Sequence, residues 1–225
     1  MLRWRGDDGA LVPPGEFIAV AEDSGLIVAI GEWVIREACK TAAAWHRNGY
    51  KFKIAINISA IQLQRKYFAD FVKAAVAETG ADPTLIEFEI TERVIIGAHD
   101  EVIEALRQLD LLGIHIAIDD FGTGYSGLSY LKQFSIDTVK IDQSFVRNLT
   151  IAADDAAIVR AIIAMSKSLG LNVVAEGVEH VAQSNMLTEL GCDHLQGYYF
   201  SRPIPADEVN AYIDAATTGR IRRTA

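Results

Sequence analysis

Two adjacent carboxylates, Asp119 and Asp120, follow an apolar run and precede a loop that contains Gly122 and Gly124. Burial of unpaired carboxylates is costly or drives them to take up protons, so this pair requires a cation or strong hydrogen-bond donors nearby. The ordinary alternative for an isolated Asp-Asp is a helix cap or an Asx turn that ends a strand. The rest of the sequence decides between these two interpretations.

Polar residues also end the other predicted strands. In chain order they are Asn57, Glu89 with Glu92 after it, Asp119 with Asp120, Lys140, Glu176 and Gln196. Any one of them alone would more often be a solvated strand end than part of a site. Six strand ends in succession, all at the same end of their strands and rich in acids, favour one site that these residues share.

The elements that must position these residues alternate along the chain. Apolar, β-branched runs predict strands at 52–58, 86–90, 114–118, 138–141, 172–175 and 193–195. Amphipathic stretches predict helices at 30–47, 67–79, 100–112, 155–169, 181–190 and 206–216, with a shorter helix at 16–23. Several helices stop at a glycine in the C-cap position, as at Gly113 and Gly170.

Repeated strand–helix units with nearly continuous apolar strands indicate a parallel sheet covered by helices. An open doubly wound sheet and a (β/α)8 barrel both fit this pattern. Neither a Gly-x-Gly-x-x-Gly motif nor a phosphate-loop Gly-Lys-Ser/Thr motif follows a strand, which weakens the nucleotide-binding open sheet. A barrel draws active-site residues from the C-terminal ends of many strands, so the sequence predicts an α/β protein with a TIM-type barrel.

Composition limits the function classes. The 225 residues, half of them hydrophobic, can bury one full core, and a net charge of −9 argues against non-specific binding of nucleic acid or of an anionic membrane. No window reaches the roughly 18 uninterrupted apolar residues of a membrane span, and the first residues are too polar for a signal peptide. Cys39 and Cys192 lie in no motif, which favours buried thiols and a cytoplasmic location.

Six segments at the predicted strand ends carry a more specific pattern. They are Asn57-Ile-Ser-Ala60, Glu89-Ile-Thr-Glu92, Asp119-Asp-Phe-Gly-Thr-Gly124, Val139-Lys-Ile-Asp142, Ala175-Glu-Gly-Val-Glu179 and Gln196-Gly-Tyr-Tyr-Phe-Ser201. In this order they resemble the EAL domain, a family of bacterial cyclic di-GMP phosphodiesterases. The resemblance extends from Leu2 to about Pro203.

This resemblance implies one EAL-type domain over 1–216 and a C-terminal tail over 217–225. It also aligns Met1 with the third position of the Glu-Ala-Leu motif that names the family. We therefore expect the Glu of that motif, and the family's first strand, to be missing from an N-terminally truncated barrel. Because such domains are commonly tethered to sensory or diguanylate cyclase (GGDEF) modules, the chain is expected to be a fragment of a longer protein.

The resemblance implies a two-metal phosphodiesterase, and the residue types agree. Carboxylate and amide oxygens suit two Mg²⁺ or Mn²⁺ ions, whereas a set without His or Cys disfavours zinc. Asn57, Glu89 and Asp119 would hold the first ion together with the missing Glu. Asp119 would bridge the two ions. Asp120 would hold the second ion, with Glu176 contributing directly or through water.

Lys140 would complete the catalytic set with Asp120 and Glu176. The resemblance implies that its ammonium lies close to the nucleophilic water, orients it and balances the negative charge. A structural ion pair is the alternative for a lysine among acids. Glu92 resembles the acid that anchors the loop after Asp120, and a surface salt bridge is its ordinary alternative.

Three residues resemble contacts to the substrate. Arg3 and Glu179 would contact the dinucleotide, and Gln196 would contact the network of water and metal around it. The planar fork of an arginine suits phosphate and guanine edges because it donates two parallel hydrogen bonds. Arg3 and Glu179 could equally be charges at the rim of the site.

The resemblance implies hydrolysis of cyclic di-GMP to linear pGpG by a homodimer, with activity impaired in this chain if the upstream Glu is absent. A receptor that binds cyclic di-GMP without turnover is the main alternative, and another metal-dependent barrel hydrolase is a remote one. The chain keeps every ligand from Asn57 onward, which favours the enzyme. In the loop implied in dimer contacts, Gly127 stands where the family usually has a second serine.

Overall fold

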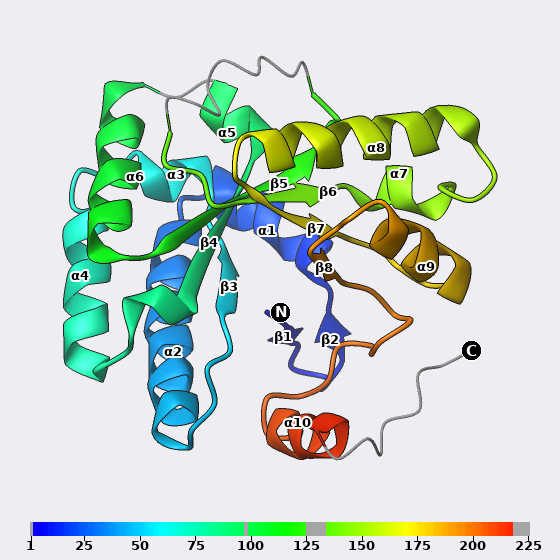
Figure 1. Cartoon of the computed structure of the whole chain (residues 1–225). Helices are drawn as coiled ribbons and strands as arrows, with labels where there is room; N and C mark the ends of the chain where they lie inside the picture. Colours follow the sequence, from blue (N-terminus) through cyan, green and yellow to red (C-terminus); the bar gives the residue numbers. More distant parts are fainter. Residues whose placement is uncertain (1, 97–98, 125–133, 218–225) are drawn as a thin grey trace. The chain divides into compact units, whose positions relative to one another are not determined.

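The computed structural model describes residues 2–96, 99–124 and 134–217 (Figure 1). They form two compact units, one made of the described residues up to Asp119 with Gly124 and 134–137, and the other of Asp120–Thr123 with the described residues from Thr138 onward. The residue Gly127 and the tail beyond Thr217 lie outside the described residues. No helix within the described part of the chain is long and apolar enough to cross a membrane.

The strands of the first unit form a hairpin and a parallel set. Strands β1 (Trp4–Arg5) and β2 (Leu11–Val12) pair antiparallel, whereas β3 (Ile54–Asn57), β4 (Ile86–Thr91) and β5 (His115–Phe121) pair parallel in chain order. The last residues of β5 belong to the second unit. Phe88, Ile90, Ile116 and Ile118 are fully buried, as expected of parallel strands that are covered on both faces.

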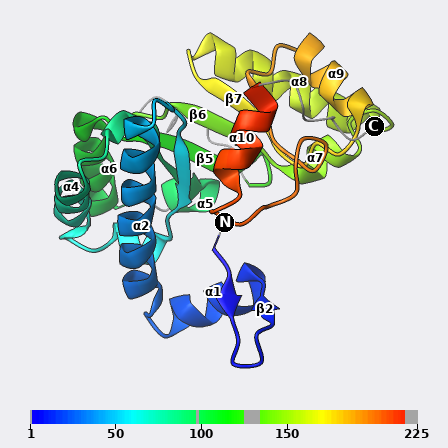
Figure 2. The ribbon, with the colours of Figure 1, turned by 90° about the horizontal axis from the view of Figure 1, so that it is seen from below.

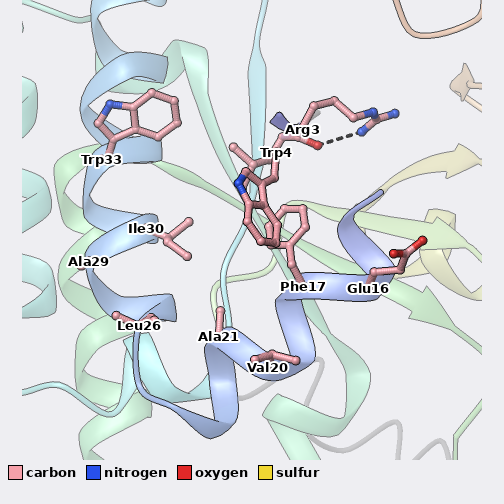
Figure 3. Close-up of a pocket in the computed structure, with 11 residues that line it drawn as sticks. Arg3, Trp4, Glu16, Phe17, Val20, Ala21, Leu26, Ala29, Ile30 and Trp33 are labelled. Carbon is pink, nitrogen blue, oxygen red and sulfur yellow. Dashed lines mark hydrogen bonds between the residues drawn. The ribbon is translucent and has the colours of Figure 1, made fainter. Parts of the chain in front are cut away.

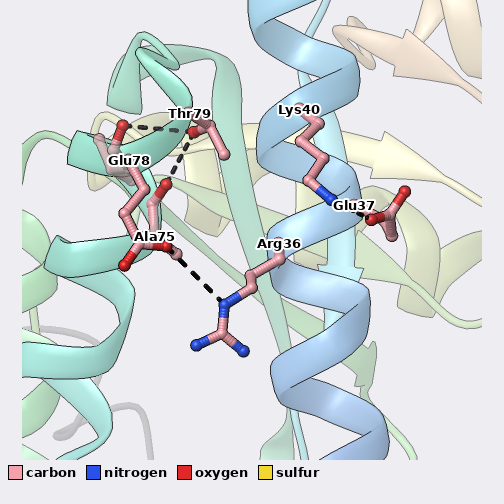
Figure 4. Close-up of polar contacts among 7 residues, drawn as sticks. Arg36, Glu37, Lys40, Ala75, Glu78 and Thr79 are labelled. Carbon is pink, nitrogen blue, oxygen red and sulfur yellow. Dashed lines mark hydrogen bonds and ion pairs between the residues drawn. The ribbon is translucent and has the colours of Figure 1, made fainter.

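The first unit contains helices of very different length, and three of them pack against one another in chain order. The helices are α1 (Pro14–Asp23), α2 (Ile27–Arg47), α3 (Ala60–Leu63), α4 (Phe68–Thr79), the 3-10 helix η1 (Pro83–Leu85), α5 (Glu92–Ile96) and α6 (Asp100–Leu112). Helix α4 contacts both α2 and α6, and Figure 2 shows the three helices side by side. Nε of Arg36 on α2 lies 3.9 Å from Oε2 of Glu78 on α4 (Figure 4). The guanidinium of Arg36 also lies over the ring of Phe71, 4.6 Å from its centroid.

The second unit repeats the parallel pattern. Strands β6 (Thr138–Ile141), β7 (Asn172–Ala175) and β8 (His194–Leu195) pair parallel in chain order. Its helices are α7 (Gln143–Arg147), α8 (Ala153–Ser168), α9 (Val181–Glu189) and α10 (Val209–Thr217). The core contains fully buried Val139, Ile141, Val173 and Leu187.

Asp193 joins the start of β8 to two neighbouring elements. Its Oδ2 accepts a hydrogen bond from the amide of Val173 at 2.8 Å, and its Oδ1 pairs with Nζ of Lys167 at the end of α8. Burial alone would raise the pKa of this carboxyl, but the hydrogen bonds from Lys167 and Val173 outweigh burial and hold the pKa below its usual value. A carboxyl with a lowered pKa in the folded state stabilises the protein above the unfolded pKa and loses that contribution as the pH falls.

We expect Asp193→Asn to lower the free energy of unfolding by about 1 kcal/mol at pH 7, because the amide cannot pair with the ammonium of Lys167. The difference from the parent chain should shrink as the pH falls from about 5 to 3, since the parent carboxyl then becomes neutral as well. Urea unfolding at several pH values measures both effects. The same substitution at exposed Asp207 is the control, and an Asp193→Asn effect that persists at pH 3 would contradict the electrostatic explanation.

Candidate functional site

The first unit brings Asn57 and Glu89 together at the C-terminal ends of β3 and β4. They lie opposite each other in the strand register, and Nδ2 of Asn57 donates to Oε2 of Glu89 at 2.8 Å. Asp119 on β5 lies opposite Thr91 on β4. Because side chains two residues apart share a face, Asp119 belongs to the same face of the strands as Glu89. This face therefore presents three of the predicted metal ligands.

A hollow of about 710 Å³ in the first unit includes this end of the strands. Asn57, Ser59 and Thr91 contribute polar groups to its lining, and residues of α1 and α2 contribute apolar ones. Mostly apolar concavities with a few polar groups are typical of small-molecule sites. The predicted ligand Asn57 is therefore accessible to a molecule in the hollow.

Asp120 adopts a left-handed backbone conformation, with φ of 53°, at the end of β5. Among the described residues it is the only one other than glycine with a positive φ. Side chains normally alternate between the faces of a strand, so this conformation breaks the alternation directly after Asp119. Such backbone conformations are concentrated at functional sites. The hydroxyl of Thr123 stabilises the turn by donating to the carbonyl of Asp120 at 2.8 Å.

The second unit brings Asp120, Lys140 and Glu176 together. Asp120 and Glu176 each offer a carboxylate oxygen, and these atoms lie within 4.8 Å of each other. Nζ of Lys140 lies 2.7 Å from Oε1 of Glu176, and Lys140 is only 3% exposed. A buried ammonium is stable only with a counter-charge, which Glu176 supplies. The carboxylates could hold a metal ion, and the lysine reduces their mutual repulsion.

Asp142 is a further acid beside this group, and the sequence reasoning assigned it no role. It caps α7 by accepting hydrogen bonds from the amide and the hydroxyl of Ser144. Burial alone would raise the pKa of Asp142, but the hydrogen bonds from the hydroxyl and the amide of Ser144 and from the amide of Gln143 lower it below its usual value. Its position in the Val139-Lys-Ile-Asp142 segment was the signal that could have identified it.

Glu92 is buried against the loop that follows Asp120. This residue begins α5 and is 2% exposed. A Cβ atom added to Gly124 would lie 3.2 Å from the carboxyl carbon of Glu92, so the carboxylate packs directly on the backbone there. The predicted role of Glu92 in anchoring this loop stays a prediction, and this close approach supports it.

The predicted substrate contacts occupy two different surroundings. Glu179 and Gln196 are exposed, and the loops that carry them are joined because the amide of Val178 donates to the carbonyl of Gln196 at 3.0 Å. Arg3 is exposed in the first unit, where its Nη1 donates to the carbonyl of Leu2 at 2.8 Å (Figure 3). The structure thus places Gln196 beside the loop of Glu176 and Glu179.

Arg3 also borders an apolar groove of about 640 Å³ in the first unit. Figure 3 shows Trp4, Phe17, Leu26 and Trp33 among its lining residues, which come from β1, α1, α2 and the turn between the two helices. The rings of Trp4 and Phe17 meet edge to face at 6.0 Å, and the side chains of Trp4 and Trp33 are more than half exposed.

Comparison with known proteins identifies what the chain resembles. The family profile described as "EAL domain" matches residues 1–203. The chain is 48% identical over 213 residues to the signaling protein YkoW of Bacillus subtilis and 43% identical over 214 residues to the bifunctional diguanylate cyclase/cyclic di-GMP phosphodiesterase MucR of Pseudomonas aeruginosa. These matches cover 95% of this chain but only 27% of YkoW and 31% of MucR.

A solved structure of the MucR phosphodiesterase in complex with c-di-GMP superposes with a TM-score of 0.89 at 43% identity. The superposition covers 93% of this chain and 85% of the MucR chain. The predicted α/β fold of the TIM-barrel type is therefore confirmed. In length, the chain spans between a quarter and a third of the two curated relatives.

Proposed function

The chain belongs to the EAL domain family, and from this premise we propose that it is a phosphodiesterase that hydrolyses cyclic di-GMP to linear pGpG. The observation that carries the proposal is the buried Lys140–Glu176 pair beside Asp120. Two further observations support it. MucR carries cyclic di-GMP phosphodiesterase activity in its name, and its phosphodiesterase structure holds c-di-GMP.

The donor set fits hard divalent cations. Asn57, Glu89 and Asp119 would hold one Mg²⁺ or Mn²⁺, and Asp120 and Glu176 would hold the other. These side chains offer only carboxylate and amide oxygens, which are the ligands that both ions prefer. When bound, such ions supply Lewis-acid chemistry that polarises a phosphoryl oxygen and lowers the pKa of water. The pair of Asn57 and Glu89 and the pair of Asp120 and Glu176 support this assignment.

Lys140 has two tasks in the proposed reaction. Its ammonium compensates the negative charge of Glu176 and so reduces the repulsion among the neighbouring carboxylates. It also donates hydrogen bonds that orient the attacking water. The water oxygen gives up a proton and forms a bond to phosphorus, one P–O bond to the ribose breaks, and the released ribose oxygen takes up a proton. One of the two phosphodiesters is thereby opened.

The substrate contacts belong to the same proposal. Arg3 would donate two parallel hydrogen bonds to phosphate or to a guanine edge. Glu179 and Gln196 would contact the dinucleotide and the water around it, and the hydrogen bond between their loops supports a shared role. We further propose a cytoplasmic homodimer tethered to sensory or diguanylate cyclase modules. MucR, which combines both enzyme activities in its name, supports the link to a diguanylate cyclase module.

A turnover assay tests the proposal. The chain is incubated with cyclic di-GMP and Mg²⁺ or Mn²⁺, and the products are separated by chromatography, with EDTA as the control. We expect pGpG to form with either metal, at a reduced rate if the Glu of the Glu-Ala-Leu motif is absent, and not to form with EDTA. If calorimetry shows binding of cyclic di-GMP and no pGpG forms, the chain is a receptor and not an enzyme. Absence of both binding and product would refute the proposal.

A further inference from the structure

Gln183, in the first turn of α9, is buried and uses both ends of its side-chain amide. Its Oε1 accepts hydrogen bonds from the backbone amides of Glu179 and His180 at 2.8 and 2.9 Å. Its Nε2 donates to the carbonyls of Val146 and Arg147 at 3.0 and 3.3 Å. One side chain therefore joins the end of the loop after β7 to the end of helix α7.

The partners of Gln183 are backbone groups at the end of one helix and just before the start of another. The last carbonyls of a helix have no partner within that helix, and those of Val146 and Arg147 end α7. The amides of Glu179 and His180 precede the first turn of α9. The amide of Leu149 also donates to the carbonyl of Val146 at 3.2 Å. An apolar side chain of the same length would therefore remove a partner mainly from the amides of Glu179 and His180 and from the carbonyl of Arg147.

Helix α7 supports two loops that carry predicted ligands. Gly177, next to Glu176, has φ of 68°, and a Cβ there would lie 2.6 Å from Cβ of Gln143 at the start of α7. Gly122, two residues after Asp120, lies against the ring of Phe145 in the middle of α7, where an added Cβ would be 3.1 Å from the ring. Both loops therefore pack on the same short helix. Gln183 holds the second end of the loop after β7, at Glu179 and His180, against the C-terminal end of that helix.

The two ends of the loop from Glu176 to His180 are held by different contacts. At the first end, the amide of Glu176 donates to the carbonyl of Ile141 at 3.2 Å, and its carboxylate pairs with Lys140. At the second end, Gln183 holds Glu179 and His180. A change at Gln183 should therefore disturb the position of Glu179 more than that of Glu176.

We propose that Gln183 is a positioning residue that fixes Glu179 for substrate binding through the backbone of its loop. This inference rests on the proposed function, in which Glu179 contacts the dinucleotide and Glu176 serves the chemistry. Gln183 itself touches neither substrate nor metal. Its removal therefore changes the KM for cyclic di-GMP more than it changes kcat.

The test compares Gln183→Met with a control on the same helix, Leu187→Ala. Leu187 is fully buried one turn further along α9, so its truncation destabilises the unit without removing any of the four hydrogen bonds of Gln183. Amide hydrogen exchange is measured by NMR for Glu179 and His180, and KM and kcat are measured with cyclic di-GMP and Mg²⁺ well below the melting temperature of each variant.

For Gln183→Met we expect exchange at Glu179 and His180 to accelerate at least tenfold and KM to rise about tenfold, with kcat reduced less than threefold. Leu187→Ala should leave both exchange rates and KM within twofold of the parent chain. Unchanged exchange rates in Gln183→Met would show that Gln183 does not hold the loop. Faster exchange with an unchanged KM would show that the loop position does not matter for substrate binding. If the parent chain neither binds nor hydrolyses cyclic di-GMP, the proposed function fails and Gln183 has no substrate to position, whereas the exchange rates still decide whether it anchors the loop.

Discussion

Replacement of Asp120 by asparagine is expected to lower kcat for cyclic di-GMP hydrolysis at least about a hundredfold. Asparagine is nearly isosteric with aspartate and is among the residues that best tolerate a positive φ, so the turn at φ 53° should survive. The substitution removes the negative charge that lies within 4.8 Å of Glu176 and opposes two positive metal ions in the proposed site. The loss should therefore fall on catalysis and not on folding.

Steady-state turnover over a range of Mn²⁺ concentrations measures this effect, with circular dichroism as the check on folding. Asp110→Asn is the matched control, because Asp110 is an exposed acid at the end of α6. We expect the control to keep the parent rate within twofold. A folded Asp120→Asn variant with undiminished turnover would remove Asp120 from the proposed metal site.

A second large effect is expected for stability. Gly197→Ala should lower the free energy of unfolding by about 3 kcal/mol or more. A Cβ at Gly197 would lie 2.1 Å from the carbonyl oxygen and 2.3 Å from the amide nitrogen of Val178. Both atoms belong to the backbone, and Val178 is tied to Gln196 and Tyr199 by hydrogen bonds of 3.0 Å. No side-chain rotation can relieve this overlap, so the two loops must separate.

Urea unfolding measures the loss, and Gly15→Ala provides the same chemical change at a glycine with open space around it. Gly15 lies in the first turn of α1, so alanine there should be neutral or slightly stabilising. Equal stabilities for the two variants would show that the approach of the two loops is looser than described.

The elements predicted from hydrophobic periodicity agree with the structure where packing enforces the pattern. The strands at 138–141 and 172–175 and the helix at 100–112 have the predicted bounds, because each is bordered by a turn or cap and has a continuous buried side. The predicted strand at 52–58 is shorter, Ile54–Asn57. Its outer residues include Phe52, whose ring instead stacks on Tyr50.

The short helices were not predicted because they are too brief to show a period. Helices α3, α5 and α7 have four or five residues each and depend on capping and tertiary contact. Ser59 and Gln62 show the difference: their reciprocal cap is visible in the sequence only as a Ser followed three residues later by Gln. The β1–β2 hairpin was not predicted for the same reason, because each of its strands has only two residues.

The candidate ligands of the site could be predicted from the sequence, whereas the residues that hold their loops in place could not. Polar residues at successive strand ends indicated Asn57, Glu89 and Glu176, and the strand register pairs the first two directly. Gln183 could not be found this way, since a glutamine in the first turn of a helix has the ordinary appearance of a solvated residue. Only its four backbone partners, which lie three to 37 positions away, distinguish it.

The groove of the first unit also gives the protein an optical property. Two of the three tryptophans, Trp4 and Trp33, line it and are more than half exposed, whereas Trp45 stacks edge to face on Phe52 at 6.3 Å. Indole emission shifts to shorter wavelength when water leaves its surroundings. We therefore expect the native fluorescence to come largely from solvent-exposed indoles. The emission wavelength and the quenching by iodide should then report, without any added dye, whether water has left this surface.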